Sequence, residues 1–308
     1  MDDEVRIATV NVNGLRASLG RGFDRWLATC GADVVALQEV RCPAALLPPL
    51  PGWQVVYDAG RRAGRNGVAL LSRVPPVAVR DSAELSGAEV GFVAEFGADG
   101  RYVEADYDLG SQRVTVASVY VTKGGLPARE PARYERKVRF LAGLGDLLGV
   151  ARTRATADGR EFLCVGDYNL AASPDDHYHG DVARPLEGYL PAEREWLRAL
   201  VAEGAGLVDV VRALHPGARG PYSWWSWRTG QLDADRGWRI DLHLATPALA
   251  ARALRGGTDR PGSSSARMSD HAPVVVDYAA DAPDAGTPGG GRMGAAWRSR
   301  HRATKGES

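Results

Sequence analysis

The sequence predicts an α/β fold in which buried β-strands alternate with helices. Short runs of apolar and β-branched residues recur along the chain, and such runs are typical of strands that are covered on both faces. Longer segments with apolar residues at helical spacing lie between some of these runs. The chain has 308 residues, of which 44% are hydrophobic, and this is enough for one large core or two small ones.

The predicted strands are short apolar runs bounded by polar or turn-forming residues. The first covers 5–10 and ends at the turn signal Asn11-Val12-Asn13-Gly14. The others cover 33–37, 68–71, 114–121, 162–165, 240–245 and 273–276. Helical spacing predicts helices from Phe23 to near Gly31 and over 134–148 and 192–201. We find no internal repeat.

We expect a catalytic domain over residues 1–278 and a tail over 279–308. From about Ala279 the chain is rich in Gly, Pro, Ala and Arg without periodicity, which is typical of a disordered segment. The last part carries five basic residues against the single acid Glu307, namely Arg292, Arg298, Arg300, Arg302 and Lys305. Two interpretations stay open: a tail that only aids solubility, and a flexible arm that contacts phosphates.

Composition argues against several classes of protein. No apolar run is long enough to span a bilayer, so we expect no membrane partner. The acidic start, residues 1–4, lacks the basic head and apolar body of a signal peptide. The three cysteines form no CxxC pair, which favours free thiols in a reducing cytoplasm over disulfides or a zinc site. Because the net charge is zero, only motifs can argue for a nucleic-acid partner.

Short polar residues of the kind that bind hard cations lie at or near the ends of predicted strands. They are Asn11, Asn13, Gln38, Glu39, Asp167, Asn169, Asp241, Asp270 and His271. Active sites in α/β proteins gather where strands end, and oxygen ligands suit Mg²⁺ or Mn²⁺ better than zinc. The set therefore predicts one site for metal-assisted hydrolysis of a phosphate ester. Taken singly, each residue also has a structural explanation, such as a turn, a helix cap or a core histidine.

Several longer motifs follow one another along the chain in a specific order. They are Asn11-Val12-Asn13-Gly14-Leu15-Arg16, Leu37-Gln38-Glu39-Val40-Arg41, Gly67-Val68-Ala69-Leu70-Leu71-Ser72, Val119-Tyr120-Val121, Gly166-Asp167-Tyr168-Asn169, Tyr222-Ser223-Trp224-Trp225-Ser226-Trp227-Arg228, Gly237-Trp238-Arg239-Ile240-Asp241 and Ser269-Asp270-His271-Ala272-Pro273-Val274. In order and spacing they resemble the exonuclease III family of apurinic/apyrimidinic endonucleases, within the endonuclease/exonuclease/phosphatase superfamily. The resemblance extends to about Tyr278.

This resemblance implies a four-layer α/β sandwich, with two packed mixed sheets flanked by helices. The implied activity is Mg²⁺-dependent cleavage of DNA on the 5′ side of abasic sites, with 3′–5′ exonuclease and 3′-phosphatase activity. Mn²⁺ is an expected substitute for the metal. The expected partner is double-stranded DNA with abasic sites or blocked 3′ ends, and the expected protein is a monomer in the cytoplasm, associated with the nucleoid.

The resemblance also implies roles for individual residues. Glu39 is the main metal ligand, with Asn11 and Asp270 completing the shell. Asp167 orients and deprotonates the attacking water, and Asn169 binds the scissile phosphate or the nucleophile. Phosphate contacts also come from His271, whose imidazole Asp241 holds in place, and from Tyr120.

The aromatic motifs carry the argument about the substrate. Trp224, Trp238 and Ile240 match positions that line a small apolar pocket in the family, and an extruded abasic sugar fits such a pocket. The alternative is that the aromatic residues fill the core, which strand alternation favours for Trp225. Lys123 and Arg239 add positive charge near the site, although Arg239 is equally consistent with a structural ion pair.

The chain departs from the family pattern at several positions. Thr122-Lys123 replaces the usual Pro and amide, which changes the geometry of a phosphate contact. Asn13 stands where some relatives carry Asp, and Arg41 replaces a common Lys. The segment 173–179 contains two histidines, which we interpret as an exposed polar loop in preference to a metal site. The alternatives for function are a related phosphodiesterase acting on RNA or another phosphate ester, and an inactive DNA-binding protein.

Overall fold

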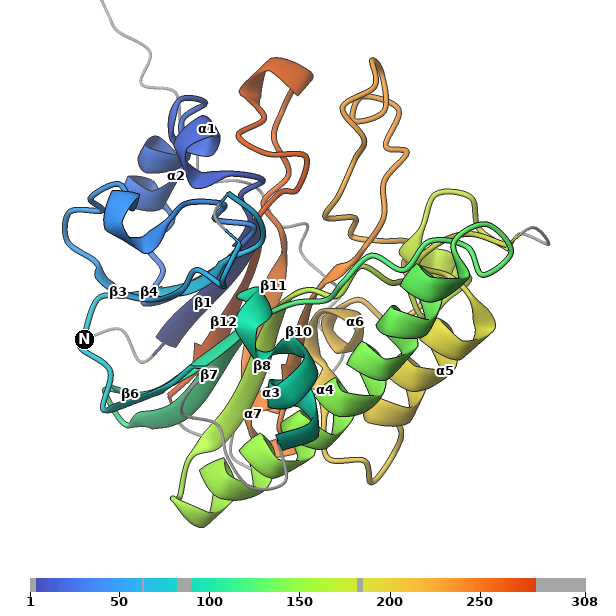
Figure 1. The fold of residues 1–308 in the computed structure, drawn as a ribbon. Helices are drawn as coiled ribbons and strands as arrows, with labels where there is room; N and C mark the ends of the chain where they lie inside the picture. Colours follow the sequence, from blue (N-terminus) through green and yellow to red (C-terminus); the bar gives the residue numbers. More distant parts are fainter. Residues whose placement is uncertain (1–3, 63, 82–89, 182–184, 281–308) are drawn as a thin grey trace, which may run out of the picture.

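Two six-stranded β-sheets pack face to face, and helices cover their outer faces, which makes a four-layer α/β sandwich (Figure 1). The computed structural model describes residues 4–62, 64–81, 90–181 and 185–280. The predicted fold class and layer arrangement are confirmed. The predicted boundary at 278 is slightly early, because Ala279 is the last residue of β12. The rest of the expected tail, from 281 to 308, lies outside the described residues.

The first sheet has the strand order β11-β12-β1-β2-β4-β3. These strands are β11 (Ala253–Thr258), β12 (Val274–Ala279), β1 (Glu4–Asn11), β2 (Val34–Gln38), β4 (Val68–Ser72) and β3 (Gln54–Asp58). β1 and β2 are parallel, with Asn11 in register with Gln38. Asn11 and Glu39 therefore lie at the same end of these two neighbouring strands.

The second sheet has the strand order β5-β6-β7-β8-β10-β9. These strands are β5 (Ala78–Arg80), β6 (Tyr102–Leu109), β7 (Gln112–Tyr120), β8 (Glu161–Asp167), β10 (Asp241–Ala245) and β9 (Val208–Asp209). Asp167 is in register with Tyr120 of the parallel strand β7 and with Asp241 of the antiparallel strand β10. Three predicted site residues thus meet across three neighbouring strands.

Alternating apolar residues of both sheets form the central core, with Ile7 and Val34 from the first sheet and Val116 and Val165 from the second. α3 (Val90–Phe96), α4 (Pro131–Ala157) and α5 (Pro191–Leu200) cover the second sheet (Figure 1). α1 (Leu15–Leu19) and α2 (Phe23–Thr29) contribute to the core on the outer face of the first. The short helices α6 (Val210–Leu214) and α7 (Pro247–Ala250) complete the fold, with single turns at Ala44–Leu46, Gly97–Asp99, Pro174–Asp176 and Ser264–Ala266.

Every predicted strand and helix is present, but five strands escaped prediction. β3 and β11 lie at the edges of the first sheet, and most of their residues are exposed or only partly buried. β5 and β9 are only three and two residues long. β6 contains the buried acids Glu104 and Asp106, which break its apolar run and form ion pairs with Arg80. α4 extends beyond the predicted 134–148. Its last turns bury only the small residues Ala151 and Ala155, which give a weak periodic signal.

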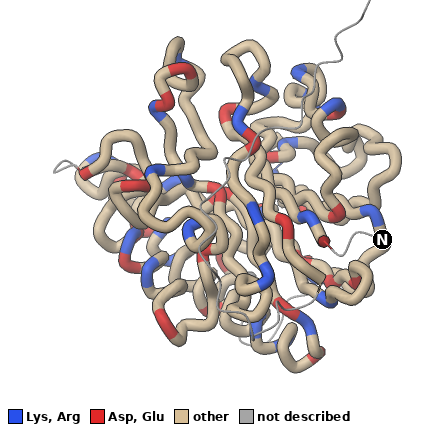
Figure 2. Tube along the Cα trace, turned by 180° about the vertical axis from the view of Figure 1, so that it is seen from behind, with Lys and Arg blue, Asp and Glu red and all other residues tan. Residues whose placement is uncertain are grey.

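Two expectations from composition can be compared with the structure. Cys30, Cys42 and Cys164 are all free thiols, as predicted. In the described part of the chain, no helix has the length and apolar character that crossing a bilayer requires. Figure 2 shows basic and acidic positions interspersed along the chain trace, in line with the zero net charge.

A buried ion pair ties the outer helices to the loop that follows β8. Lys137 of α4 is fully buried, and its Nζ lies 2.8 Å from Glu193 Oε1 of α5. The same Nζ donates to the backbone oxygen of Asn169 at 2.9 Å. Glu193 also accepts a hydrogen bond from the backbone N–H of Leu190 at the start of α5. The pair therefore supports both the helix packing and the position of Asn169.

We predict that Glu193→Ala lowers the free energy of unfolding by about 3 kcal/mol or more, because it leaves the Lys137 ammonium buried without a counter-charge. Urea denaturation followed by circular dichroism measures this loss. Glu195→Ala is the matched control, since Glu195 is an exposed residue of the same helix and should change stability by less than about 0.5 kcal/mol. Equal effects of the two substitutions would rule out a stabilising role for the pair.

Candidate active site

The strand ends of the two sheets meet at one end of the sandwich and bring most of the predicted site residues together. Those that are at least nine-tenths buried are Asn11, Glu39, Tyr120, Asp167, Asn169, Asp241 and His271. They come from six separate segments of the chain, so only the tertiary structure assembles them.

The side-chain amide of Asn11 links the two sheets at the centre of this group. Its Nδ2 donates to Glu39 Oε1 at 2.8 Å and to Asp167 Oδ2 at 2.9 Å. Asp167 also accepts hydrogen bonds from Asn169, from the backbone N–H at 2.8 Å and from Nδ2 at 3.2 Å. The Asn169 amide donates in addition to the Val121 carbonyl at 2.9 Å, which fixes its orientation.

Four site residues or their neighbours have a left-handed backbone conformation that non-glycine residues rarely adopt. The φ angles are 46° at Asn13, 52° at Glu39, 51° at Arg41 and 49° at Asn169. Such conformations cost energy and persist where the surrounding structure imposes them, often at functional sites. They turn Glu39 and Asn169 out of their strands and toward the group around Asn11.

The His271 ring lies between two aspartates, hydrogen-bonded to Asp241 and within ion-pair distance of Asp167. His271 Nδ1 lies 2.8 Å from Asp241 Oδ2, and His271 Nε2 lies 3.8 Å from Asp167 Oδ2. Burial opposes protonation of His271, but Asp241 and Asp167 outweigh it and raise the pKa of His271 to about 10. Burial, together with the charges of Asp241 and Glu39, raises the pKa of Asp167 even though His271 acts in the opposite direction.

The donor set fits a hard divalent cation. Asn13 connects two of the predicted ligands, because its N–H donates to Asn11 Oδ1 at 2.9 Å and its Nδ2 donates to Asp270 Oδ1 at 2.7 Å. Around them the buried or partly buried carboxylates are Glu39, Asp167, Asp241 and Asp270, while the cations in contact with these are Arg41 and His271. Negative charge therefore exceeds positive charge, and the available ligand atoms are carboxylate and amide oxygens.

A second arrangement of ligand atoms is less suited to a metal. Single ligand atoms of Asp167, Asp241 and His271 lie within 4.8 Å of one another, which a metal ion could bridge. His271 is already hydrogen-bonded to Asp241 and holds a proton at neutral pH, because its pKa is about 10 after the opposing effects of burial and of the two aspartates. A metal there would have to displace that proton.

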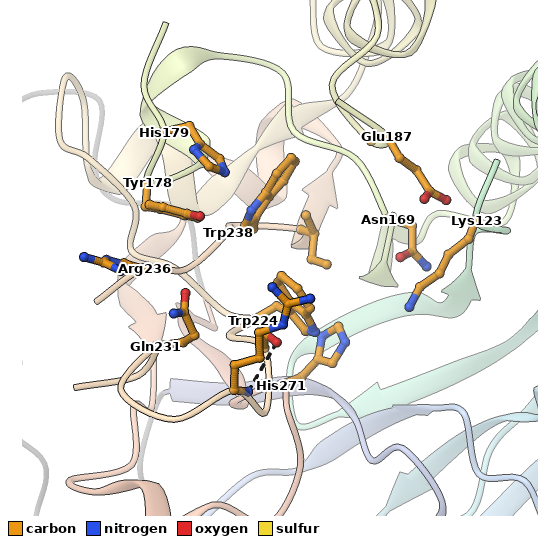
Figure 3. Close-up of a pocket in the computed structure, with 14 residues that line it drawn as sticks. Lys123, Asn169, Tyr178, His179, Glu187, Trp224, Gln231, Arg236, Trp238 and His271 are labelled. Carbon is orange, nitrogen blue, oxygen red and sulfur yellow. Dashed lines mark hydrogen bonds between the residues drawn. The ribbon is translucent and has the colours of Figure 1, made fainter. Parts of the chain in front are cut away.

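A cavity of about 480 Å³ opens beside this group. Its lining includes the predicted pocket residues Trp224, Trp238, Ile240 and Lys123, and also Asn169 and His271. Figure 3 shows His179, Tyr178 and Trp238 toward one side of the cavity and Asn169, Glu187 and Lys123 on the other. The cavity thus joins an aromatic wall to the polar residues around Asp167.

The aromatic residues divide between the cavity and the core. Trp225 is only 1% exposed and packs with Tyr222, Leu232 and Ala272, so its predicted core position is confirmed. Trp224 and Trp238 are partly exposed at the cavity, and Trp227 is 46% exposed. The interpretation that all of them fill the core is therefore wrong.

Two predictions need correction. Arg239 does not line the cavity: it is 2% exposed and pairs with Asp176 at 2.7 Å and Asp209 at 2.8 Å, so the structural alternative is right. The segment 173–179 is not an exposed loop, because Asp176 and His177 are buried and its other residues are partly buried. The reason is that Asp176 pairs with Arg239 and Arg212, which draws the segment inward.

Sequence reasoning missed two supporting residues, Ser223 and Ser269. Ser223 Oγ donates to Asp241 Oδ2 at 2.6 Å and accepts from the N–H groups of Ile240 and Asp241. Ser269 Oγ donates to the backbone oxygen of Asn11 at 2.6 Å. Both serines lie inside motifs that were identified, but a serine next to a turn has no distinctive signal of its own.

Comparison with known proteins agrees with this geometry. The chain belongs to the endonuclease/exonuclease/phosphatase family, whose profile matches residues 8–271. Within it the chain resembles the exodeoxyribonuclease III of Haemophilus influenzae, with 28% identity over 284 residues, 89% of this chain and 100% of that protein. The chain is therefore an enzyme, a hydrolase of the exonuclease III type.

Solved structures support the same assignment. An AP endonuclease from Archaeoglobus fulgidus is 28% identical, with a TM-score of 0.74 and coverage of 89% of this chain and 99% of that one. A 3′ phosphatase from Neisseria bound to a product DNA hairpin is 26% identical, with a TM-score of 0.72 and coverage of 89% and 99%.

We predict that Asn11→Asp, studied with EDTA present, lowers the free energy of unfolding at pH 8 by about 2 kcal/mol. The substitution replaces the amide that donates to Glu39 and Asp167 with a carboxylate, which repels both of them. The deficit relative to wild type should shrink near pH 4. The introduced carboxyl has a raised pKa in the folded state, so its penalty is present above the unfolded value and disappears below it. Denaturation curves at both pH values check this, and a deficit independent of pH would contradict the shared-donor interpretation.

Proposed function

We propose that this protein is a Mg²⁺-dependent DNA-repair nuclease. It hydrolyses phosphodiesters on the 5′ side of abasic sites in double-stranded DNA, and it also removes nucleotides and phosphates from 3′ ends. The observation that carries this proposal is one cavity lined both by Asn169 and His271, which lie beside Asp167, and by the wall of Trp224 and Trp238.

Asp167 is the base that activates water. Its raised pKa, caused by burial and by the neighbouring charges of Asp241 and Glu39, makes it a better proton acceptor than an ordinary aspartate. Three hydrogen bonds from Asn11 and Asn169 hold the carboxylate in one orientation. A fixed base costs no reorganisation when the water attacks phosphorus.

His271 binds a non-bridging oxygen of the scissile phosphate. Its proton is retained at neutral pH because Asp241 accepts from Nδ1, which leaves Nε2 as the donor toward the cavity. Both Nδ2 hydrogens of Asn169 are used by Asp167 and Val121, so its Oδ1 is available to accept from the attacking water. Tyr120 adds a donor from the neighbouring strand end. Each such donor contributes on the order of a hundredfold to the rate when it stabilises charge in the transition state.

A basic groove continues from Tyr120 and provides contacts for the flanking DNA backbone. It has a volume of about 260 Å³ and is lined by Arg101, Tyr120, Thr122, Lys123, Arg133 and Arg136. The Arg101 guanidinium stacks over the Tyr120 ring at 4.6 Å. Cations outnumber acids locally although the whole chain is neutral, which suits binding to phosphates.

Glu39, Asn11 and Asp270 would hold the metal. A divalent cation bound there would neutralise charge on the phosphate and on the leaving 3′ oxygen. Asn13 stands where some relatives carry Asp. Its amide donates to Asp270, so it orients a ligand of the metal instead of adding another negative charge.

The aromatic wall favours an abasic sugar over a normal nucleotide. Trp224, Trp238 and Ile240 offer an apolar surface next to the phosphate-binding groups. Extruding a nucleotide from the duplex is easiest where no base has to be unstacked or unpaired. The free energy of extrusion and the apolar wall therefore both favour abasic sites.

The experiment that tests this function compares three labelled duplexes: one with a single abasic analogue, an intact one and one with a 3′-phosphate end. Each is incubated with Mg²⁺, with Mn²⁺ and with EDTA. We expect cation-dependent incision 5′ to the abasic analogue. Reaction at 3′ ends alone would assign the specificity to strand ends instead of abasic sites. No reaction on any DNA would favour RNA or another phosphate ester as the substrate.

We predict that Asp167→Asn lowers the incision rate by about 10²–10⁴-fold, because the amide cannot accept a proton, while the binding constant for abasic duplex changes little. Single-turnover incision and fluorescence anisotropy measure the two quantities. Lys123→Ala is the contrasting variant, with weaker binding and reduced salt dependence. If Asp167→Asn weakened binding as much as it slowed incision, Asp167 would not be the base.

A further inference from the structure

Four backbone segments that are far apart in the sequence pair beside the cavity. Antiparallel bridges join His177 to Trp238, Trp238 to Trp224, and Trp224 to His271. The N–H of Trp238 donates to Trp224 O at 2.9 Å, and the reverse hydrogen bond has the same length. Directly opposed residues of paired strands project to the same face. These four side chains therefore form one row that leads away from His271.

The far end of this row is fixed by ring contacts that extend to α5. The His177 ring stacks on Trp238, with centroids 4.8 Å apart and an interplanar angle of 29°. Tyr189 meets the same ring edge-on, with centroids 4.2 Å apart. The Arg194 guanidinium of α5 lies over the Tyr189 ring at 4.6 Å. Trp238 is thus held between the cavity and a stack anchored on a helix.

His177 has no solvent-exposed surface, and within the described residues neither ring nitrogen has a hydrogen-bond partner. Burial, together with the nearby His179, lowers the pKa of His177 to about 4, so the ring is neutral at physiological pH. A buried polar ring without partners destabilises the fold. The ring contacts of His177 are made by its faces and edges, and they are directed at Trp238, Tyr189 and His179.

The backbone of His177 is also held firmly. Asp176 accepts hydrogen bonds from the N–H groups of Ala172 and Ser173 and pairs with Arg239. The N–H of Arg239 donates to Asp176 O at 2.7 Å, and the N–H of Tyr178 donates to Gly237 O at 3.0 Å. The segments that carry His177 and Trp238 are therefore locked together, so the His177 ring has a defined place from which to support the indole.

We propose that His177 is a positioning residue for substrate selection: by stacking against Trp238 it holds the indole in the orientation that an extruded abasic sugar requires. This inference rests on the proposed function, since it assumes that Trp238 forms the sugar pocket. It assigns no contact between His177 and DNA. Removal of a 3′-terminal phosphate needs the polar groups around Asp167 but not the pocket, so it does not depend on His177.

The test measures kcat and KM for abasic-site incision and for 3′-phosphate release in four variants. Trp238→Ala tests the pocket itself. His177→Ala removes the stack, and His177→Phe restores a flat ring without its nitrogens. Leu249→Ala is the control for lost stability, because Leu249 is 1% exposed on α7 and does not line the cavity.

We expect Trp238→Ala and His177→Ala to lower kcat/KM for abasic incision on the order of tenfold, and to lower 3′-phosphate release much less, as when a binding group is misplaced. His177→Phe should restore abasic incision to the wild-type level. It should also raise the melting temperature above that of wild type, because the ring no longer buries unpaired nitrogens. Leu249→Ala should lower the melting temperature without changing the ratio of the two activities.

The other outcomes separate the two ideas. If Trp238→Ala reduced both activities equally, the pocket of the proposed function would be wrong, and the role of His177 with it. If Trp238→Ala were selective and His177→Ala were not, only the role of His177 would be overturned. If His177→Phe behaved like His177→Ala, the ring nitrogens would matter and stacking would not be the cause.

Discussion

The amide of Asn11 is the interaction on which the active site depends. It lies at the end of β1 in the first sheet and donates to Asp167 at the end of β8 in the second. A second polar link lies beside it, where Gln38 of the first sheet donates to Ser118 of the second at 3.0 Å. Buried polar groups of this kind must be paired, so they specify one alignment of the two sheets. A shift of either strand by one residue would turn these side chains to the other face.

The same alignment gathers more negative charge than the protein itself neutralises. Asp167, Asp241 and Glu39 are buried within a small volume, with Asp270 at its edge. His271 compensates part of this charge, and its raised pKa, in spite of burial, reflects the fields of Asp241 and Asp167. The arrangement is costly for folding, and the left-handed backbone at Glu39 and Asn169 adds to that cost. A site that binds a cation and a phosphate provides a reason for both.

The pocket wall is built differently from the catalytic group. Its tryptophans sit on loops, and these loops are held from behind by Arg239, which pairs with Asp176 and Asp209. Arg239 is therefore important to the site without lining it. The ion pairs of Arg239 and the stack of His177 on Trp238 hold the pocket loops in place, as the β-strands hold Asp167. Reaction chemistry and substrate selection can therefore be altered separately.

The sequence by itself determined the α/β class, the central strands and the residues around Asp167, because apolar periodicity and short motifs are local properties. It could not predict β6, whose buried acids need distant arginines, or the edge strands, whose pattern depends on what covers them. Nor could it decide between core and cavity for the tryptophans, or between an ion pair and a ligand contact for Arg239. Only the tertiary structure decided these, since burial and charge pairing depend on residues brought together from other parts of the chain. His177 is the clearest case. This histidine belongs to a polar segment, but its ring is buried because the neighbouring Asp176 forms an ion pair with the buried Arg239.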